Sequence, residues 1–120
     1  MLTLLNDKPD IVIINIGAND LNNLESINII GNIIHIIDIC KNYGVNEVYV
    51  SGLLFRENQQ QKVSEVNDFL RHRQVVNGFI YINNEKISKV NLWNDKIHLN
   101  KSGTIILANN FIDALNKNVL

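Results

Sequence analysis

A short run of branched aliphatic residues between a proline and a glycine places the strongest constraint on how this chain folds. Residues 10–16 read Asp-Ile-Val-Ile-Ile-Asn-Ile, follow Pro9 and stop at Gly17. β-Branched residues favour strands, and a nearly continuous apolar run is typical of a parallel strand that is covered on both faces. We therefore predict a buried parallel strand over residues 10–16.

The segment after this strand has a helical pattern. Apolar residues spaced by three and four predict a helix from about Leu24 to Tyr43, started by a capping box of Asn22 and Glu25 and ended at Gly44. Its expected buried face consists of Ile27, Ile30, Ile34 and Ile37.

The rest of the chain repeats this alternation. A strand is expected at Val48–Val50, a helix from a cap at Asn58 to Gly78, a strand at Phe79–Ile82 and a last helix after an irregular stretch over 83–100. The second helix is expected to bury Val63, Val66, Phe69 and Leu70 and to carry Arg71, His72 and Arg73 at its C-terminal end. In the last helix the expected apolar face is Ala108, Phe111, Ile112 and Leu115. Strands that alternate with helices predict one α/β domain over residues 1–120, a parallel sheet in three layers.

Composition excludes several classes of function. The chain has 11 Lys and Arg against 12 Asp and Glu, a net charge of −1, so we expect no nucleic-acid partner. Polar residues interrupt the most apolar window, Ile27–Cys40, and residues 1–10 lack the apolar stretch of a signal peptide, so we expect no membrane partner and a cytoplasmic location. Cys40 is expected to be a buried, inert thiol. The three histidines lack metal-ligand spacing, and we expect no metal and no cofactor.

The first candidate motif is the polar turn Gly17-Ala18-Asn19-Asp20, directly after the first strand. Ligands of parallel sheets bind at the carboxyl ends of the strands, where Gly17 would permit a sharp bend and the amide of Asn19 would offer N–H donors. Alternatively, Asn and Asp simply make the turn. Asn and Ile fill 40 of the 120 positions, 21 and 19, and we attribute that bias to the coding sequence.

The second candidate motif is Asp95-Lys96-Ile97-His98, before the last helix. A histidine that acts as general base needs a carboxylate to fix its tautomer, and an Asp three positions earlier on a tight turn can supply it. An ordinary surface loop is the alternative. Nearby, Arg56 either faces a substrate or is a solvated loop charge, and Trp93 either walls a pocket beside His98 or anchors its loop on the core.

Together these motifs resemble those of the SGNH or GDSL-type esterase and lipase family, over roughly Pro9 to Leu115. Gly17–Asp20 is similar to its Gly-x-Asn-Asp block, and Asp95–His98 is similar to its Asp-x-x-His block. The resemblance implies a flavodoxin-like strand order and hydrolysis of a small ester or acyl substrate without metal or cofactor. It implies that Asn19 is an oxyanion-hole donor in the turn that Gly17 opens, that His98 is the general base, and that Asp95 orients it. The chain also resembles, more loosely, retroelement-associated esterase-like domains.

Two blocks of that family are missing from this sequence. The family's nucleophile is the serine of a Gly-Asp-Ser turn, which occurs nowhere in the 120 residues, and the glycine block that follows is absent as well. Ser51 lies near the right sheet edge but lacks the strained elbow of a nucleophile, Ser102 is placed to cap or begin the last helix, and no positional argument favours Ser26, Ser64 or Ser88.

We therefore expect the later part of an SGNH-like domain, truncated at the N-terminus and inactive alone, or else a non-catalytic interaction module. The missing strands would lie beside residues 11–16, and we expect self-association through that edge or membership of a longer gene product.

Overall fold

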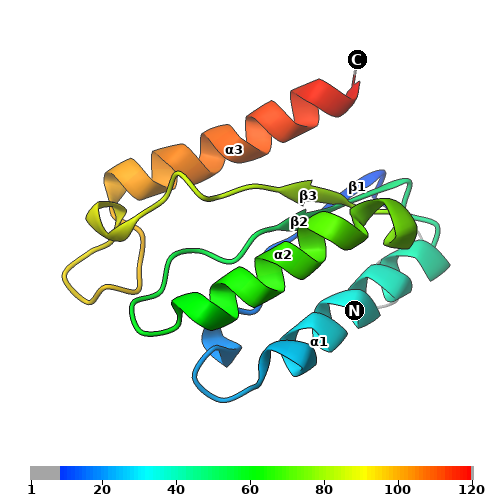
Figure 1. The fold of residues 1–120 in the computed structure, drawn as a ribbon. Coiled ribbons are helices and arrows are strands. Elements are labelled where there is room, and N and C mark those ends of the chain that lie inside the picture. The colour runs from blue at the N-terminus through cyan, green and yellow to red at the C-terminus, as the bar shows by residue number, and fades with distance from the viewer. Residues whose placement is uncertain (1–8, 120) are drawn as a thin grey trace.

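The computed structural model describes residues 9–119, which form three parallel strands and three long helices (Figure 1). In chain order the elements are β1 (Ile11–Ile14), α1 (Ser26–Asn42), β2 (Glu47–Ser51), α2 (Gln60–Asn77), β3 (Ile80–Ile82) and α3 (Lys101–Val119). Two 3₁₀ turns lie between them, η2 (Ala18–Asp20) and η3 (Lys89–Asn91).

The sheet has the order β1-β2-β3, with all strands parallel. Val12 lies opposite Val48, and Val50 lies opposite Tyr81. α1 and α2 cover one face of the sheet and α3 lies on the other (Figure 1). Because both crossovers step in the same direction along the sheet and share one hand, their helices fall on the same face. The three-layer parallel α/β arrangement predicted from the alternation is therefore confirmed.

The main core lies between the sheet and the pair α1 and α2, and its α1 side differs from the predicted face. Ile29, Ile33 and Ile37 are the buried residues of α1, whereas the predicted Ile27 is 76% exposed. Isoleucine fills so many positions of this helix that several stripes satisfy the same spacing. Only the docking of the helix on the sheet selects one of them.

Both predicted N-terminal caps are wrong. α1 begins at Ser26 without a side-chain cap, and Asn22 instead accepts a hydrogen bond from Gln59 Nε2 at 3.0 Å. α2 begins after Gln59, while Asn58 adopts a left-handed conformation with φ of 68°. Short polar side chains at these positions are used for tertiary contacts and turns, to which Asn is equally suited.

Three further expectations fail, one because α2 is longer than expected and two because α3 and β1 are only partly covered. α2 continues to Asn77, so Arg71–Arg73 lie before its last turn, although Gly78 ends the helix as predicted. α3 packs on β3 and η3 only in part, and Ile112 on its predicted apolar face is 52% exposed. Ile11 in β1 is 39% exposed, so the first strand is not covered on both faces along its length.

Candidate active site

Three loops meet at the carboxyl ends of the strands. The turn after β1, the loop from β2 to α2 and the loop from β3 to α3 all lie beyond the same edge of the sheet, at the left of Figure 1. Since parallel strands end at a common edge, segments far apart in the sequence are brought together there. Both candidate motifs are in these loops.

Gly17 opens the first turn in a conformation that suits glycine. Its φ is 102°, and a Cβ there would lie 2.9 Å from Leu53 Cδ2 and 3.3 Å from Ile29 Cγ2. Glycine is thus required by both the backbone and the packing. Asn19 follows in η2, exposed to solvent, and no hydrogen bond within residues 9–119 engages its side chain. The N–H groups of its amide are therefore open to a ligand.

His98 and Asp95 form a direct pair. His98 Nδ1 lies 2.6 Å from Asp95 Oδ2, while Asp95 Oδ1 accepts from the backbone N–H groups of Ile97 at 2.9 Å and His98 at 3.0 Å. A carboxylate can only accept, so the imidazole proton is on Nδ1 and the lone pair is on Nε2. This is the tautomer that a general base requires.

The same contacts keep Asp95 ionised. The hydrogen bond to His98, followed by those from the backbone of Ile97 and His98, lowers the pKa of Asp95 from 3.8 to about 2. Because these donors favour the charged carboxylate, Asp95 remains an acceptor for His98 at any pH well above that value.

Backbone hydrogen bonds shape the turn that carries the histidine. Trp93 N–H donates to His98 O and Lys96 N–H donates to Trp93 O, both at 2.8 Å. Lys96 has a φ of 60°, which lets the chain reverse within the turn. The indole of Trp93 is exposed. Its ring therefore neither walls one of the cavities nor anchors the loop on the core, and Trp93 holds this turn through its backbone alone.

The loop from β2 to α2 bridges the two motifs. Arg56 Nη1 donates to Ala18 O at 3.3 Å, and the next residue, Glu57, forms ion pairs with Lys89 at 3.3 Å and Lys96 at 3.4 Å. The two lysines lower the pKa of Glu57. Within the described residues no hydrogen bond or ion pair joins the Asn19 turn to the His98 turn directly. Their relative position thus depends on this intervening loop.

Buried and half-buried asparagines, which sequence reasoning set aside as compositional bias, position the loops. Asn84 donates to Ser51 Oγ and Gly52 O at 2.7 Å each, and Asn110 of α3 donates to Asn84 at 2.9 Å. Asn100 Oδ1 caps α3 by accepting from Gly103 N–H at 3.0 Å. The signal available in the sequence was their place, directly after a strand or before a helix.

None of the serines is placed as an evident nucleophile. Ser51 is 2% exposed and holds its hydroxyl against Asn84, so the one serine near the sheet edge is sealed in the structure. Ser102 lies in the first turn of α3 and donates to Asn100 Oδ1 at 2.7 Å. Ser26 donates to Glu65, and Ser88 caps η3.

The candidate site is open to solvent. The side chains of His98 and Asp95 are 77% and 45% exposed. Three cavities of about 570, 250 and 290 Å³ lie elsewhere, and Gly17, Asn19 and the Asp95–His98 pair line none of them. In residues 9–119, no three His, Cys, Asp or Glu side chains gather as a metal centre would require, and no helix there has the length and apolarity to cross a bilayer.

Comparison with known proteins supports the fold. No protein-family model and no curated protein matches the sequence. Among solved structures, the crystal structure of TesA is similar with a TM-score of 0.77, at 16% sequence identity, over 95% of this chain and 67% of that chain. The chain shares the parallel α/β fold of that structure. At this identity the similarity concerns the fold alone.

Proposed function

We propose that this chain supplies the histidine and the oxyanion donor of an SGNH-type ester-hydrolase site, and that it hydrolyses no ester on its own. The Asp95–His98 pair, on the same sheet edge as the Asn19 turn, is the observation that carries the proposal. His98 would take a proton through Nε2, Asp95 would hold the imidazole and stabilise its charged form, and Asn19 would donate to the developing oxyanion.

The chemistry still needs a nucleophile. A serine acyl-enzyme mechanism uses a hydroxyl that is activated by the histidine, with neither metal nor cofactor, and the sequence contains no Gly-Asp-Ser turn. Loss of the nucleophile from such a triad removes about a millionfold of rate. The substrate class is accordingly a small ester or acyl compound, turned over only when a serine is supplied from outside this sequence. The cytoplasmic location and the kinship with retroelement-associated esterase-like domains stay predictions.

A non-catalytic interaction module is the second candidate. It is favoured by the openness of the site, since an exposed His98 is not enclosed by the water-excluding walls that strengthen electrostatic catalysis. In that case the polar turns would bind a partner without chemistry.

Hydrolysis of p-nitrophenyl acetate separates the possibilities. We expect the chain to release p-nitrophenol no faster than free imidazole at equal concentration, and a fluorophosphonate probe for activated serines to leave it unlabelled. His72→Ala is the matched control for His98→Ala, because His72 is also exposed and also hydrogen-bonded through Nδ1, to Asp68 O at 2.7 Å. Turnover that is lost in His98→Ala and kept in His72→Ala would place a nucleophile within the chain.

The protonation state of His98 tests the role of the site itself. Long-range ¹H–¹⁵N correlation spectra of the neutral imidazole should show the proton on Nδ1, and Asp95→Asn should shift that population toward the other tautomer. A predominantly Nε2-protonated His98 in the unaltered chain would leave no acceptor for a substrate hydroxyl. That result would favour the interaction module.

A further inference from the structure

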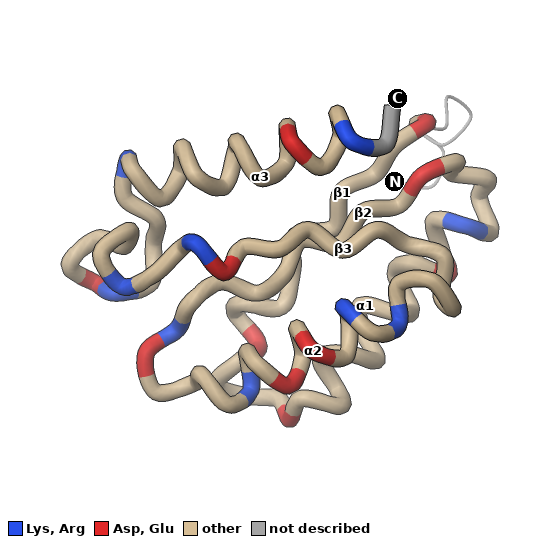
Figure 2. The backbone as a smooth tube through the Cα atoms, turned by 45° about the horizontal axis from the view of Figure 1, so that its top comes forward, with Lys and Arg blue, Asp and Glu red and all other residues tan. Residues whose placement is uncertain are grey.

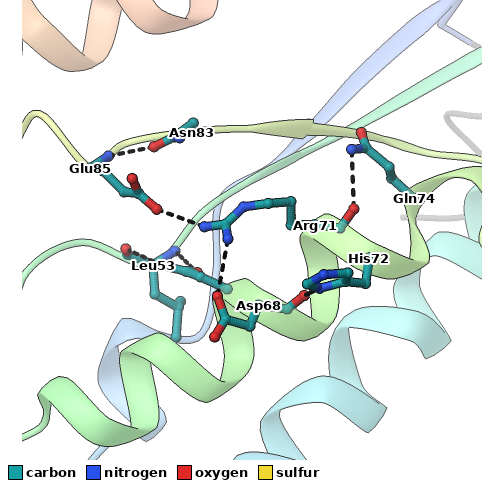
Figure 3. Close-up of polar contacts among 8 residues, drawn as sticks. Leu53, Asp68, Arg71, His72, Gln74, Asn83 and Glu85 are labelled. Carbon is teal, nitrogen blue, oxygen red and sulfur yellow. Dashed lines mark hydrogen bonds and ion pairs between the residues drawn. The ribbon is translucent and has the colours of Figure 1, made fainter.

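The two edges of the sheet are protected differently. At the β3 edge, Gly52 N–H donates to Ile82 O at 2.9 Å, so Ile82 turns its backbone groups toward β2 and its neighbour Tyr81 turns them outward. The outward N–H of Tyr81 is capped by Gln74 Oε1 of α2 at 3.0 Å. Figure 3 shows Gln74 on α2, beside the ribbon of this strand. β3 is also the shorter edge strand, and a short, capped edge offers little to another strand.

The β1 edge has no such cap in the described structure. Glu47 N–H donates to Asp10 O at 3.0 Å, so by alternation Val12 and Ile14 face β2 and the backbone groups of Ile11 and Ile13 point away from the sheet. Within residues 9–119, no hydrogen bond is made to these outward groups. They form a row of alternating donors and acceptors.

The side chains along this edge also lack the devices that prevent strand pairing. No charged residue and no proline occurs between Asp10 and Asp20, and β1 pairs with β2 in continuous register without a bulge. In Figure 2 the tube of β1 is tan, with neither blue nor red along the strand. Natural edges usually carry a lysine, a proline, a bulge or a cover at such a place.

We infer that the β1 edge is a dimerisation surface that pairs with β1 of a second copy of this chain. An antiparallel pairing across a two-fold axis normal to the sheet puts Ile11 opposite Ile13 of the second copy, and Ile13 opposite Ile11. These are the residues with outward backbone groups, so each pair exchanges both N–H···O bonds. The result is one continuous sheet across the two copies.

A second copy is the occupant that the charges favour. In this register Asp10, the charged residue next to the strand, lies opposite Ile14 of the second copy, so no like charges meet. A two-fold axis normal to the sheet places the same face of both sheets on the same side. The exposed side chain of Ile11 in one copy therefore continues the apolar face of the sheet of the other copy. The pairing groups belong to the sheet edge and not to the His98 turn, so the pairing can be tested without any activity of that turn. The missing strands predicted from the family resemblance would lie beside the same edge, so a strand placed there and a second copy exclude each other.

Amide hydrogen exchange tests the pairing without any substitution. In the unaltered chain we expect the amides of Ile11 and Ile13 to gain protection as the protein concentration rises, at least tenfold between about 10 μM and 1 mM, while those of Val12 and Ile14 are protected throughout. Sedimentation over the same range should show conversion to twice the mass of one chain. A single-chain mass up to 1 mM, with Ile11 and Ile13 exchanging freely, would overturn the inference and leave the edge for a foreign strand.

Two variants separate the strand edge from other apolar surface. Ile13→Pro removes only an outward donor and is tolerated by an edge strand, so it should abolish the dimer while the far-UV circular dichroism is retained. Ile112→Lys alters the exposed face of α3 and should leave dimerisation unchanged. The opposite pattern would assign the association to α3 and overturn the inference. Should Ile13→Pro fold poorly, the exchange experiment decides by itself.

Discussion

The buried contact between Asn67 and Leu53 offers the sharpest test of how the site is held. Asn67 Oδ1 accepts from Leu53 N–H at 2.8 Å, and Asn67 Nδ2 donates to Leu53 O at 3.0 Å, with both residues buried. Figure 3 shows Leu53 in the loop after β2, above α2, with dashed lines at its backbone groups. Leu53 also lies against Gly17, so the two hydrogen bonds connect α2 with the turn that carries Asn19.

Asn67→Ala leaves two buried backbone groups of Leu53 without partners. Each unsatisfied group costs about 1–3 kcal/mol, so the free energy of unfolding should fall by about 2–6 kcal/mol. With a urea m-value of about 2 kcal/mol/M, the midpoint followed by far-UV circular dichroism should fall by about 1–3 M. Asn109→Ala, on the exposed face of α3, is the control and should stay within about 0.5 kcal/mol of the unaltered chain.

The outcome that refutes this reasoning is a small effect. If Asn67→Ala unfolds within about 0.5 kcal/mol of the unaltered protein, the two bonds do not hold the loop, and the connection from α2 to the Asn19 turn is wrong. A changed m-value would point instead to an altered denatured state or to loss of two-state unfolding.

Three further predictions concern the turns themselves. Gly17→Ala should destabilise the protein by about 1–2 kcal/mol because its φ of 102° is unfavourable for L-residues. Gly31→Ala is the control, because Gly31 lies in a helix with nothing within 4 Å of the new Cβ, and it should stabilise the protein by about 0.5–1 kcal/mol. If thermal melts show the same change in stability for both variants, the left-handed conformation of Gly17 is not what makes glycine necessary there. The pKa of the Asp95 carboxyl, followed by ¹³C NMR, should be about 2. Because this pKa in the folded protein lies below the ordinary 3.8, the ionised carboxylate stabilises the fold fully above pH 4, and this stabilisation is lost as the pH falls through 2. A midpoint near 4 would mean that the pair with His98 is not formed. Glu57→Gln should speed amide exchange in the turn of His98 by up to about fivefold, and unchanged exchange would show that the ion pair with Lys96 does not restrain it.

Much of the fold follows from local pattern. The run at residues 11–14 and the alternation of apolar periods predict a parallel α/β sheet because strand and helix bury their side chains with different periods. The two polar turns were recognised from their places after the first strand and before the last helix. The Asp95–His98 contact could be predicted because its two residues lie only three positions apart in one turn.

The helix faces and the loop positions were decided by packing. Among the isoleucines of α1, the sequence does not distinguish Ile29 from Ile27, since every stripe is equally apolar before the helix meets the sheet. Asn67 has no local mark either, and the place of Asn84 after β3 does not show that its side chain contacts the end of β2. Each is buried against the end of β2, where an unsatisfied backbone group would be costly, and an asparagine amide can donate and accept at once.

The sequence by itself determined the order of the elements, the sharp turn at Gly17 and the pairing of a carboxylate with a histidine, because each depends on neighbours along the chain. The tertiary structure decided that Arg56 and Glu57 connect the two turns, that Ser51 is buried, and that β3 is capped while β1 is not. Those features arise between segments that meet only when parallel strands align their ends. The pattern of residues along one segment does not predict which side chain of another segment will pack against it.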